Sequence, residues 1–278
     1  MSEGNRWGWG SAPTLGLFAA AVVVLVAWAS YERRVPEPLV DIELMRVHGV
    51  WTTNLTAFLI GYGMFGSFIL IPQFVQTPAT AGYGFGAGVT GAGLFLLPSA
   101  AVMLVAGPLA GTLGSRVGSK LPLLIGTGSA AASFLFLSVA HSEQWQIVAA
   151  VFLLGFGIGM SFASMANLIV EAVPQHQTGE ATGMNTIMRT VGGAFGAQIA
   201  AAIVTDHIAA GSRYASESGF TEAFVIGAVA VTVALAAATL IPRPGPRVRI
   251  GPDPLRRSVH GPSRIEDQRG RRPVPRAG

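Results

Sequence analysis

The segment GTLGSRVGSK, residues 111–120, combines three glycines with Arg116 and Lys120, the only lysine of the chain. Glycines followed by a lysine are typical of phosphate-binding loops, and clustered basic residues are typical of nucleic-acid contacts. The phosphate-binding pattern requires Gly-Lys-Ser/Thr after a strand, whereas Ser119 separates Gly118 from Lys120 here. The glycines of GFGIG, residues 155–159, also lack the spacing of a dinucleotide-binding loop. The sequence therefore predicts neither nucleotide binding nor a nucleic-acid interface.

Metal binding and covalent catalysis lack their usual residues. The chain has no cysteine, and its five histidines never stand four residues apart: His48, His141, His176, His207 and His260. No nucleophile is paired with a base and an acid in any recognisable pattern. We therefore predict no metal site, no cofactor and no enzymatic activity, and we interpret the histidines as loop or membrane-interface residues.

The composition indicates that most of the chain lies in lipid. Hydrophobic residues make up 51% of it and charged residues only 12%, against about 25% charged residues in soluble domains. A helix that crosses a bilayer needs about 20 apolar residues. Seven segments meet that requirement: 13–31, 50–72, 89–113, 121–140, 145–173, 183–205 and 221–242. Because the runs are long and do not alternate apolar with polar residues, the predicted fold class is all-α, a polytopic membrane protein with seven transmembrane helices.

Glycine, proline and tryptophan mark the ends of these segments. GYGFGAG, residues 82–88, together with Pro72 and Pro78, separates the second span from the third. Pro98 and Pro108 fall inside the third span, where neighbouring helices can accommodate a kink. Tryptophan favours the membrane interface, and all five tryptophans lie near predicted span ends: Trp7, Trp9, Trp28, Trp51 and Trp145.

The distribution of basic residues predicts orientation. Arg116 and Lys120 lie on the same predicted side as residues 243–278, a tail with ten arginines and only three acidic residues. Basic residues concentrate in cytoplasmic loops, so we place this side in the cytoplasm and the N-terminus outside, in a plasma (inner) membrane. The predicted spans are odd in number and begin outside the membrane, yet no signal peptide is recognisable before them. We therefore expect further helices upstream. The tail is predicted to be disordered and attracted to anionic lipid.

The segment at 111–120 resembles the inner-loop signature of the major facilitator superfamily, in which a glycine- and Arg/Lys-containing loop joins two helices on the cytoplasmic side. Gly111, Leu113, Arg116, Gly118 and Lys120 match the signature, and Ser115 occupies the position at which the family carries an acid. Arg116 and Lys120 either latch the inward gate, as the resemblance implies, or only anchor the topology.

The resemblance extends over residues 1–242 and is narrower than the superfamily. SEGNRWGWGS, the apolar run after it and YERRVPEPLVDIELMR look like the eighth helix and following loop of 14-span drug:proton antiporters. EAVPQHQTGEATGMNTIMRTVGGAFGAQIA looks like the junction of their twelfth and thirteenth helices. This resemblance implies a peripheral inserted helix and cytoplasmic linker at 1–48, a C-terminal six-helix half at 49–242, and the tail at 243–278.

By the same resemblance, the second, third, fifth and sixth spans line a substrate cavity of an efflux transporter working by alternating access. Its partners would be lipid, a small amphipathic substrate, protons, and a missing N-terminal half or a second copy. Polar residues in these spans are cavity candidates: Thr52, Thr53, Asn54, Tyr62, Gln73, Asn167, Asn185, Arg189 and Gln198.

Structural roles compete with these assignments. A single polar side chain often forms only a helix–helix hydrogen bond, and Arg189, expected one to two turns into its helix, could extend to the membrane interface. Three G-x-x-x-G pairs, at 107/111, 155/159 and 192/196, predict close helix packing. No Asp or Glu lies in the middle of a span, since Glu171 and Asp206 fall at span ends, so no proton carrier is evident. The alternative function is a membrane scaffold or regulatory remnant that does not transport.

Overall fold

The computed structural model of the chain describes residues 10–32, 34, 44–208 and 212–242. This part of the chain contains seven helices that are long and apolar enough to cross a membrane. They are α2 (Ala12–Glu32), α3 (His48–Gln76), α4 (Val89–Val117), α5 (Lys120–Val139), α6 (Gln144–Ala172), α7 (Thr178–Asp206) and α8 (Glu217–Leu240). Short 3₁₀ turns are η1 (Leu44–Arg46), η2 (Ala79–Ala81) and η3 (Gln175–Gln177). The prediction of seven transmembrane helices is confirmed, and the tail at 243–278 lies outside the described residues.

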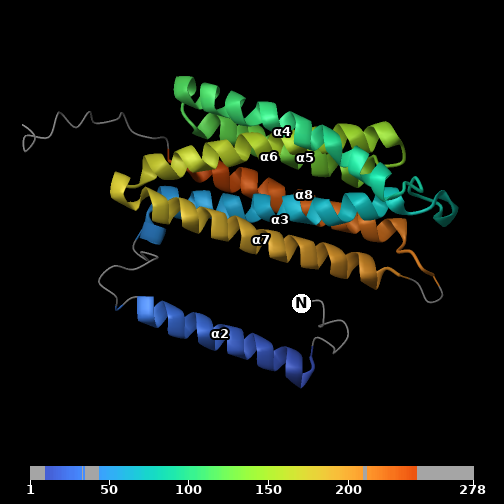
Figure 1. Ribbon diagram of the computed structural model, residues 1–278, viewed down its shortest axis with the longest axis horizontal. Helices are drawn as coiled ribbons and strands as arrows, with labels where there is room; N and C mark the ends of the chain where they lie inside the picture. Colours follow the sequence, from blue (N-terminus) through green and yellow to red (C-terminus); the bar gives the residue numbers. More distant parts are fainter. Residues whose placement is uncertain (1–9, 33, 35–43, 209–211, 243–278) are drawn as a thin grey trace, which may run out of the picture. The chain divides into compact units, whose positions relative to one another are not determined.

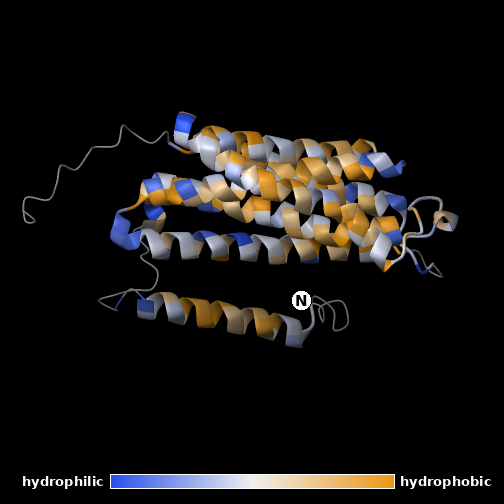
Figure 2. Ribbon diagram, turned by 45° about the horizontal axis from the view of Figure 1, so that its top comes forward, coloured by the Kyte–Doolittle hydropathy of each residue, from blue (hydrophilic) through white to orange (hydrophobic). Residues whose placement is uncertain are grey.

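The apolar character of α2 extends around the whole helix. Residues 22–26 are all valine or leucine, and each is at least 58% exposed. A helix that is hydrophobic on every face is stable only when another apolar phase covers it. The composition of α2 therefore fits a lipid-surrounded span, and Figure 2 shows hydrophobic colouring over its middle, between more hydrophilic ends.

Helices α3 to α8 form a bundle in which α3 lies parallel to α7 and α4 lies parallel to α6, whereas α5 is antiparallel to α6 and α8 (Figure 1). Helix α3 packs mainly on α7 and α8, α6 packs on α4 and α5, and α5 also packs on α8. The helices alternate in direction, so the α4–α5 and α6–α7 connections share one end with the C-terminus of α8. The connections α3–α4, α5–α6 and α7–α8 share the other end. We call these the 118-end and the 141-end.

Glycine allows the backbones of α3 and α7 to touch. A Cβ atom added at Gly192 would lie 1.9 Å from the carbonyl oxygen of Phe58, and one at Gly196 would lie 2.0 Å from that of Tyr62. Only glycine fits at such a distance. The G-x-x-x-G pair at 192/196 thus makes a close helix contact, as small residues do in membrane bundles.

The other two G-x-x-x-G pairs differ from each other. Gly155 and Gly159 of α6 pack against α4, where added Cβ atoms would meet Ser99 and Ala106. Gly107 and Gly111 of α4 have no described atom within 4 Å of the Cβ position. The third predicted close contact is therefore absent from the described part of the chain.

Two local predictions were wrong. Pro72 was expected to help end the second span, but α3 continues past it to Gln76, whose side chain donates to the Pro72 carbonyl oxygen at 2.9 Å. The sixth span was expected to begin at residue 183, whereas α7 begins at Thr178. Three threonines in its first turns bond the carbonyl oxygen four residues earlier, which satisfies their hydroxyls within the helix: Thr182, Thr186 and Thr190.

Candidate functional site

The α4–α5 connection, which carries the 111–120 motif, consists of Gly118 and Ser119. Gly118 has φ +88°, in the region that favours glycine, and its N–H donates to the Gly114 carbonyl oxygen at 2.9 Å. This ends α4 and allows α5 to begin at Lys120. The glycine of the motif is thus required by the turn itself.

Lys120 holds the C-terminus of α8. Its Nζ donates to the carbonyl oxygens of Thr239 at 2.6 Å and Ile241 at 2.5 Å. His48 Nε2 lies 3.0 Å from the Leu240 carbonyl oxygen and completes the cap. Terminal helix carbonyls lack intrahelical donors, and a cation there also interacts favourably with the helix dipole. Lys120 therefore joins α5 to α8 within the bundle.

Ser115 and Arg116 lie in a different environment. Ser115 Oγ donates to the Thr112 carbonyl oxygen of its own helix at 2.9 Å. Arg116 is exposed and makes no hydrogen bond or ion pair with any described residue. The carboxylate at this turn comes from α6 instead, because Ser119 Oγ donates to Glu171 Oε1 at 3.1 Å. Of the two basic residues in the motif, only Lys120 forms hydrogen bonds with described residues.

Asn54 and Asn185 are predicted cavity residues whose side chains form a hydrogen bond with each other. Asn185 Nδ2 donates to Asn54 Oδ1 at 2.9 Å and lies 3.4 Å from the Thr53 carbonyl oxygen. Both asparagines are buried. The Thr52 and Thr53 hydroxyls bond carbonyl oxygens of their own helix. This arrangement connects α3 to α7 at the 118-end.

Arg189 lies near the middle of α7. Eleven residues separate it from Thr178, which corresponds to three turns, or roughly 16 Å along the helix axis. The expectation of one to two turns was wrong because α7 starts earlier than predicted. Arg189 is three residues from the midpoint of α7, roughly 4–5 Å along the axis, so its backbone lies near mid-membrane depth if α7 spans the bilayer.

The Arg189 guanidinium rests on an aromatic ring and has no anion beside it. Its Cζ is 4.2 Å from the centroid of Phe162 on α6, which is cation–π geometry. It makes no hydrogen bond or ion pair with the residues that the structure describes. Charges at this depth are costly, and in membrane proteins they occur on substrate and ion pathways.

The remaining predicted residues are dispersed. Tyr62 is half-buried on the α3–α7 seam, near Gly63, Gly66 and Gly196. Gln73 and Asn167 are exposed, and Gln198 is half-buried on α7. Asn167 lies near the motif, with Nδ2 3.9 Å from the position that a Gly114 Cβ would take.

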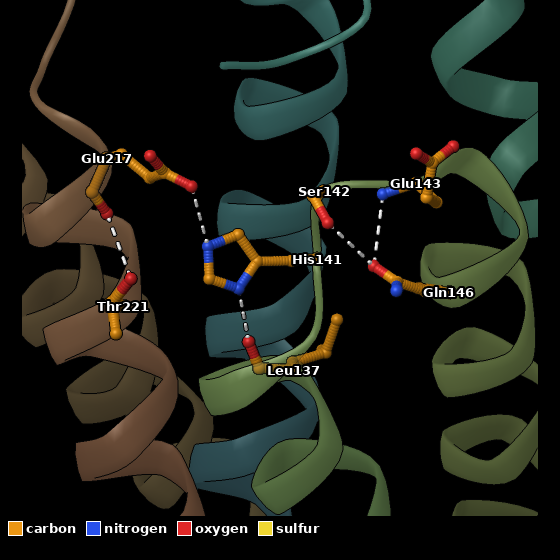
Figure 3. Close-up of polar contacts among 7 residues, drawn as sticks. All are labelled: Leu137, His141, Ser142, Glu143, Gln146, Glu217 and Thr221. Carbon is orange, nitrogen blue, oxygen red and sulfur yellow. Dashed lines mark hydrogen bonds and ion pairs between the residues drawn. The ribbon is translucent and has the colours of Figure 1, made fainter. Parts of the chain in front are cut away.

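A polar cluster at the 141-end was not predicted from the sequence. His141 and His207, interpreted there as loop or interface residues, each place Nε2 beside a glutamate carboxylate of α8, at 3.1 and 3.3 Å. Figure 3 shows the first pair. Nearby, the Tyr83 hydroxyl donates to the Ala215 carbonyl oxygen, and burial raises the pKa of this phenol. The partners are 76 and 132 residues apart, so no local sequence pattern could reveal them.

These features define a polytopic helical membrane protein, and comparison with known proteins gives its family. The sequence profile of the Major Facilitator Superfamily matches residues 4–197. The chain belongs to this superfamily.

Its relatives include drug-resistance proteins of bacteria. The chain is 26% identical to the multidrug transporter protein MdtP of Bacillus subtilis (strain 168), over 72% of this chain and 36% of that protein. It is 31% identical to a tetracycline resistance determinant of Streptomyces rimosus, over 70% of this chain and 55% of the relative. The tetracenomycin C resistance and export protein of Streptomyces glaucescens is 26% identical over 75% of this chain and 38% of its own length. The chain thus spans between about a third and just over half of these relatives.

Proposed function

We propose that α3 to α8 form one half of a transporter that exports small amphipathic molecules by alternating access. Support comes from superfamily membership and from relatives named for multidrug, tetracycline and tetracenomycin C resistance. The chain matches only part of each relative, so the proposal includes a second helical half with which this bundle works. In detail, the bundle corresponds to the C-terminal half of a 14-span antiporter, with 1–48 as an inserted peripheral helix and linker.

The observation that carries the proposal is the position of Arg189. A guanidinium at mid-membrane depth, on an aromatic ring and without an anion, is a contact site for a substrate that passes this level. Phe162 supplies an apolar surface beside the charge, as an amphipathic substrate requires. The further cavity-lining candidates are Tyr62, Gln73, Asn167 and Gln198. Asn54 and Asn185 hold α3 against α7 through their hydrogen bond.

The two basic residues of the 111–120 motif have separate roles in this proposal. Lys120 is a fixed anchor, because its ammonium already caps α8. Arg116 is the gate residue, since its guanidinium remains available to an acid outside the described chain. Ser115 bonds its own helix and supplies no charge, so the latch depends on Arg116 together with that external acid.

The energy source in this proposal is proton entry across the plasma membrane, with the 118-end in the cytoplasm. The excess of Lys and Arg on that side supports the orientation. No Asp or Glu lies mid-span in this chain, so the coupling carboxylate is assigned to the second half.

Tetracycline accumulation tests the proposal against the alternative of a scaffold that does not transport. The assay uses cells that naturally make the chain, so that any second half is present. We expect Arg189→Ala to raise intracellular tetracycline to the level of cells without the chain. Arg213→Ala, which removes an exposed arginine between α7 and α8, should leave accumulation unchanged. Equal accumulation in wild-type and chain-deficient cells would favour the scaffold.

A further inference from the structure

His141 and Glu217 make a contact in which both imidazole nitrogens face oxygen atoms (Figure 3). His141 Nδ1 is 2.7 Å from the Leu137 carbonyl oxygen, one turn back on α5. Its Nε2 is 3.1 Å from Glu217 Oε1, in the first turn of α8. The ring joins the end of α5 to the start of α8.

Counting hydrogens shows that this contact holds a proton. A carbonyl oxygen can only accept, so Nδ1 carries a hydrogen. In a neutral imidazole Nε2 is then an acceptor, and an ionised carboxylate is also only an acceptor. Two acceptors cannot share a hydrogen bond. The contact therefore requires one proton between Nε2 and Oε1, held either as imidazolium with carboxylate or as neutral imidazole with carboxylic acid.

A second histidine repeats the arrangement at the end of α7. His207 Nδ1 is 2.9 Å from the Ile203 carbonyl oxygen, and its Nε2 is 3.3 Å from Glu222 Oε2. This second contact is within ion-pair distance but is not a hydrogen bond, so the hydrogen count applies to His141–Glu217 alone. An added Cβ at Gly219 would lie 2.7 Å from His207 Cβ, so His207 packs directly on the first turn of α8. The first turns of α8 are thus contacted by a histidine from the end of α5 and by another from the end of α7.

The surroundings allow protons to reach the first pair. His141 is buried, and its ring packs edge-on against Phe74 with centroids 5.3 Å apart. The Glu217 side chain is 48% exposed and connects the pair to solvent. The other described titratable or charged groups of the 141-end are Tyr83, Glu143, Asp206, Arg213, Tyr214 and the His207–Glu222 pair.

None of these groups supplies the missing proton to His141. The Tyr83 hydroxyl already donates to the Ala215 carbonyl oxygen. Glu143 caps the N-terminus of α6 and points away from His141 (Figure 3). Asp206 and Arg213 belong to the end of α7 and the segment after it, and both are exposed. The proton must therefore come from water.

We propose that His141–Glu217 is a proton-binding site that links the start of α8 to the end of α5, beside the His207–Glu222 contact at the end of α7. With its proton the pair is neutral and bonded. Without the proton, the Nε2 lone pair and the carboxylate repel each other, and the contact between the end of α5 and the first turn of α8 opens. Histidine is the side chain that exchanges protons near neutral pH, so the contact responds to the pH of the compartment facing the 141-end. The proposal does not depend on the transport function.

Distance measurement between spin labels tests this directly, because the chain has no cysteine. Labels at Ser142→Cys and Ser218→Cys, both exposed, report on the α5–α8 contact in the full chain in lipid nanodiscs. We expect one short distance at about pH 5 and loss of that single population at about pH 9. In Glu217→Gln the amide N–H can donate to neutral Nε2, so the short distance should persist at both pH values.

Glu143→Gln is the matched control, since it removes a carboxylate at the same end. Its label-to-label distance should respond to pH as that of the wild type does. Glu217→Ala should lose the single short distance at both pH values. A wild-type distance that does not respond to pH would overturn the proposal. So would a Glu217→Gln variant that responds as the wild type does, or one that lacks the short distance at both pH values.

Discussion

Gly192 offers the sharpest test of the α3–α7 packing. A Cβ at this position would lie 1.9 Å from the Phe58 carbonyl oxygen, far inside contact distance. Because the neighbour is backbone, no side chain can rotate away, and α7 must move by about 1 Å or more. Overpacking of this kind costs about 1–3 kcal/mol. Alanine also gains up to about 1 kcal/mol of helix propensity over glycine, which offsets part of this cost.

Gly107→Ala is the matched control for Gly192→Ala. Both glycines lie in G-x-x-x-G pairs within apolar helices, but Gly107 has no described atom within 4 Å of its Cβ position. The substitution should therefore leave the free energy of unfolding unchanged or raise it by up to about 1 kcal/mol. The same Gly→Ala change should therefore lower the free energy of unfolding at residue 192 and leave it unchanged or raise it at residue 107.

The assay is denaturant unfolding of the purified full chain in mild detergent, with both variants measured beside the wild type. We expect Gly192→Ala to be destabilised by up to about 2 kcal/mol after the full helix gain is included. A Gly192→Ala variant as stable as Gly107→Ala would refute the close approach of α3 and α7.

Three further predictions concern polar contacts. Lys120→Met should lower the free energy of unfolding by about 1 kcal/mol because α8 loses its cap, while Arg116→Met should leave it unchanged. Equal effects of the two substitutions in the same unfolding assay would contradict the anchor role of Lys120. Asn54→Ala should cost about 1–3 kcal/mol because the buried Asn185 amide loses its partner, and replacing both asparagines by leucine should recover most of that loss in unfolding measurements. The pKa of Tyr83 is raised above 10.0, so the folded chain favours the protonated phenol, and the free energy of unfolding should fall as the pH rises above that value. Tyr83→Phe should remove this fall from unfolding measurements made over a series of pH values. The same fall in Tyr83→Phe as in the wild type would count against burial of the phenol.

The helices were predictable from the sequence because one strong physical constraint determines them. Apolar runs without charge have few alternatives to membrane helices, and predicted ends fell within about five residues of the observed ones. The start of α7 deviated most, because its first turns are polar and hydropathy does not distinguish them from a loop. Their threonines bond backbone oxygens of the same helix, a local interaction that hydropathy ignores.

The polar contacts were much less predictable. Lys120 and Ile241 are 121 residues apart, and His141 and Glu217 are 76 apart. Which residues meet depends on how the helices pack, and the sequence carries no pairwise signal for that packing. Residue type did indicate that Asn185 and Arg189 were unusual in an apolar helix. It could not indicate that Asn185 pairs with Asn54, nor that Arg189 rests on Phe162 three turns into α7.

Uptake of tetracycline into everted membrane vesicles is the most direct test of the central claim, that this bundle is half of a proton-driven exporter. The vesicles come from cells that naturally make the chain, and an imposed gradient makes their interior acidic, so export appears as uptake. The account predicts gradient-dependent uptake that Arg189→Ala abolishes and Arg213→Ala preserves. Equal uptake by vesicles with and without the chain, or full uptake by Arg189→Ala vesicles, would contradict it.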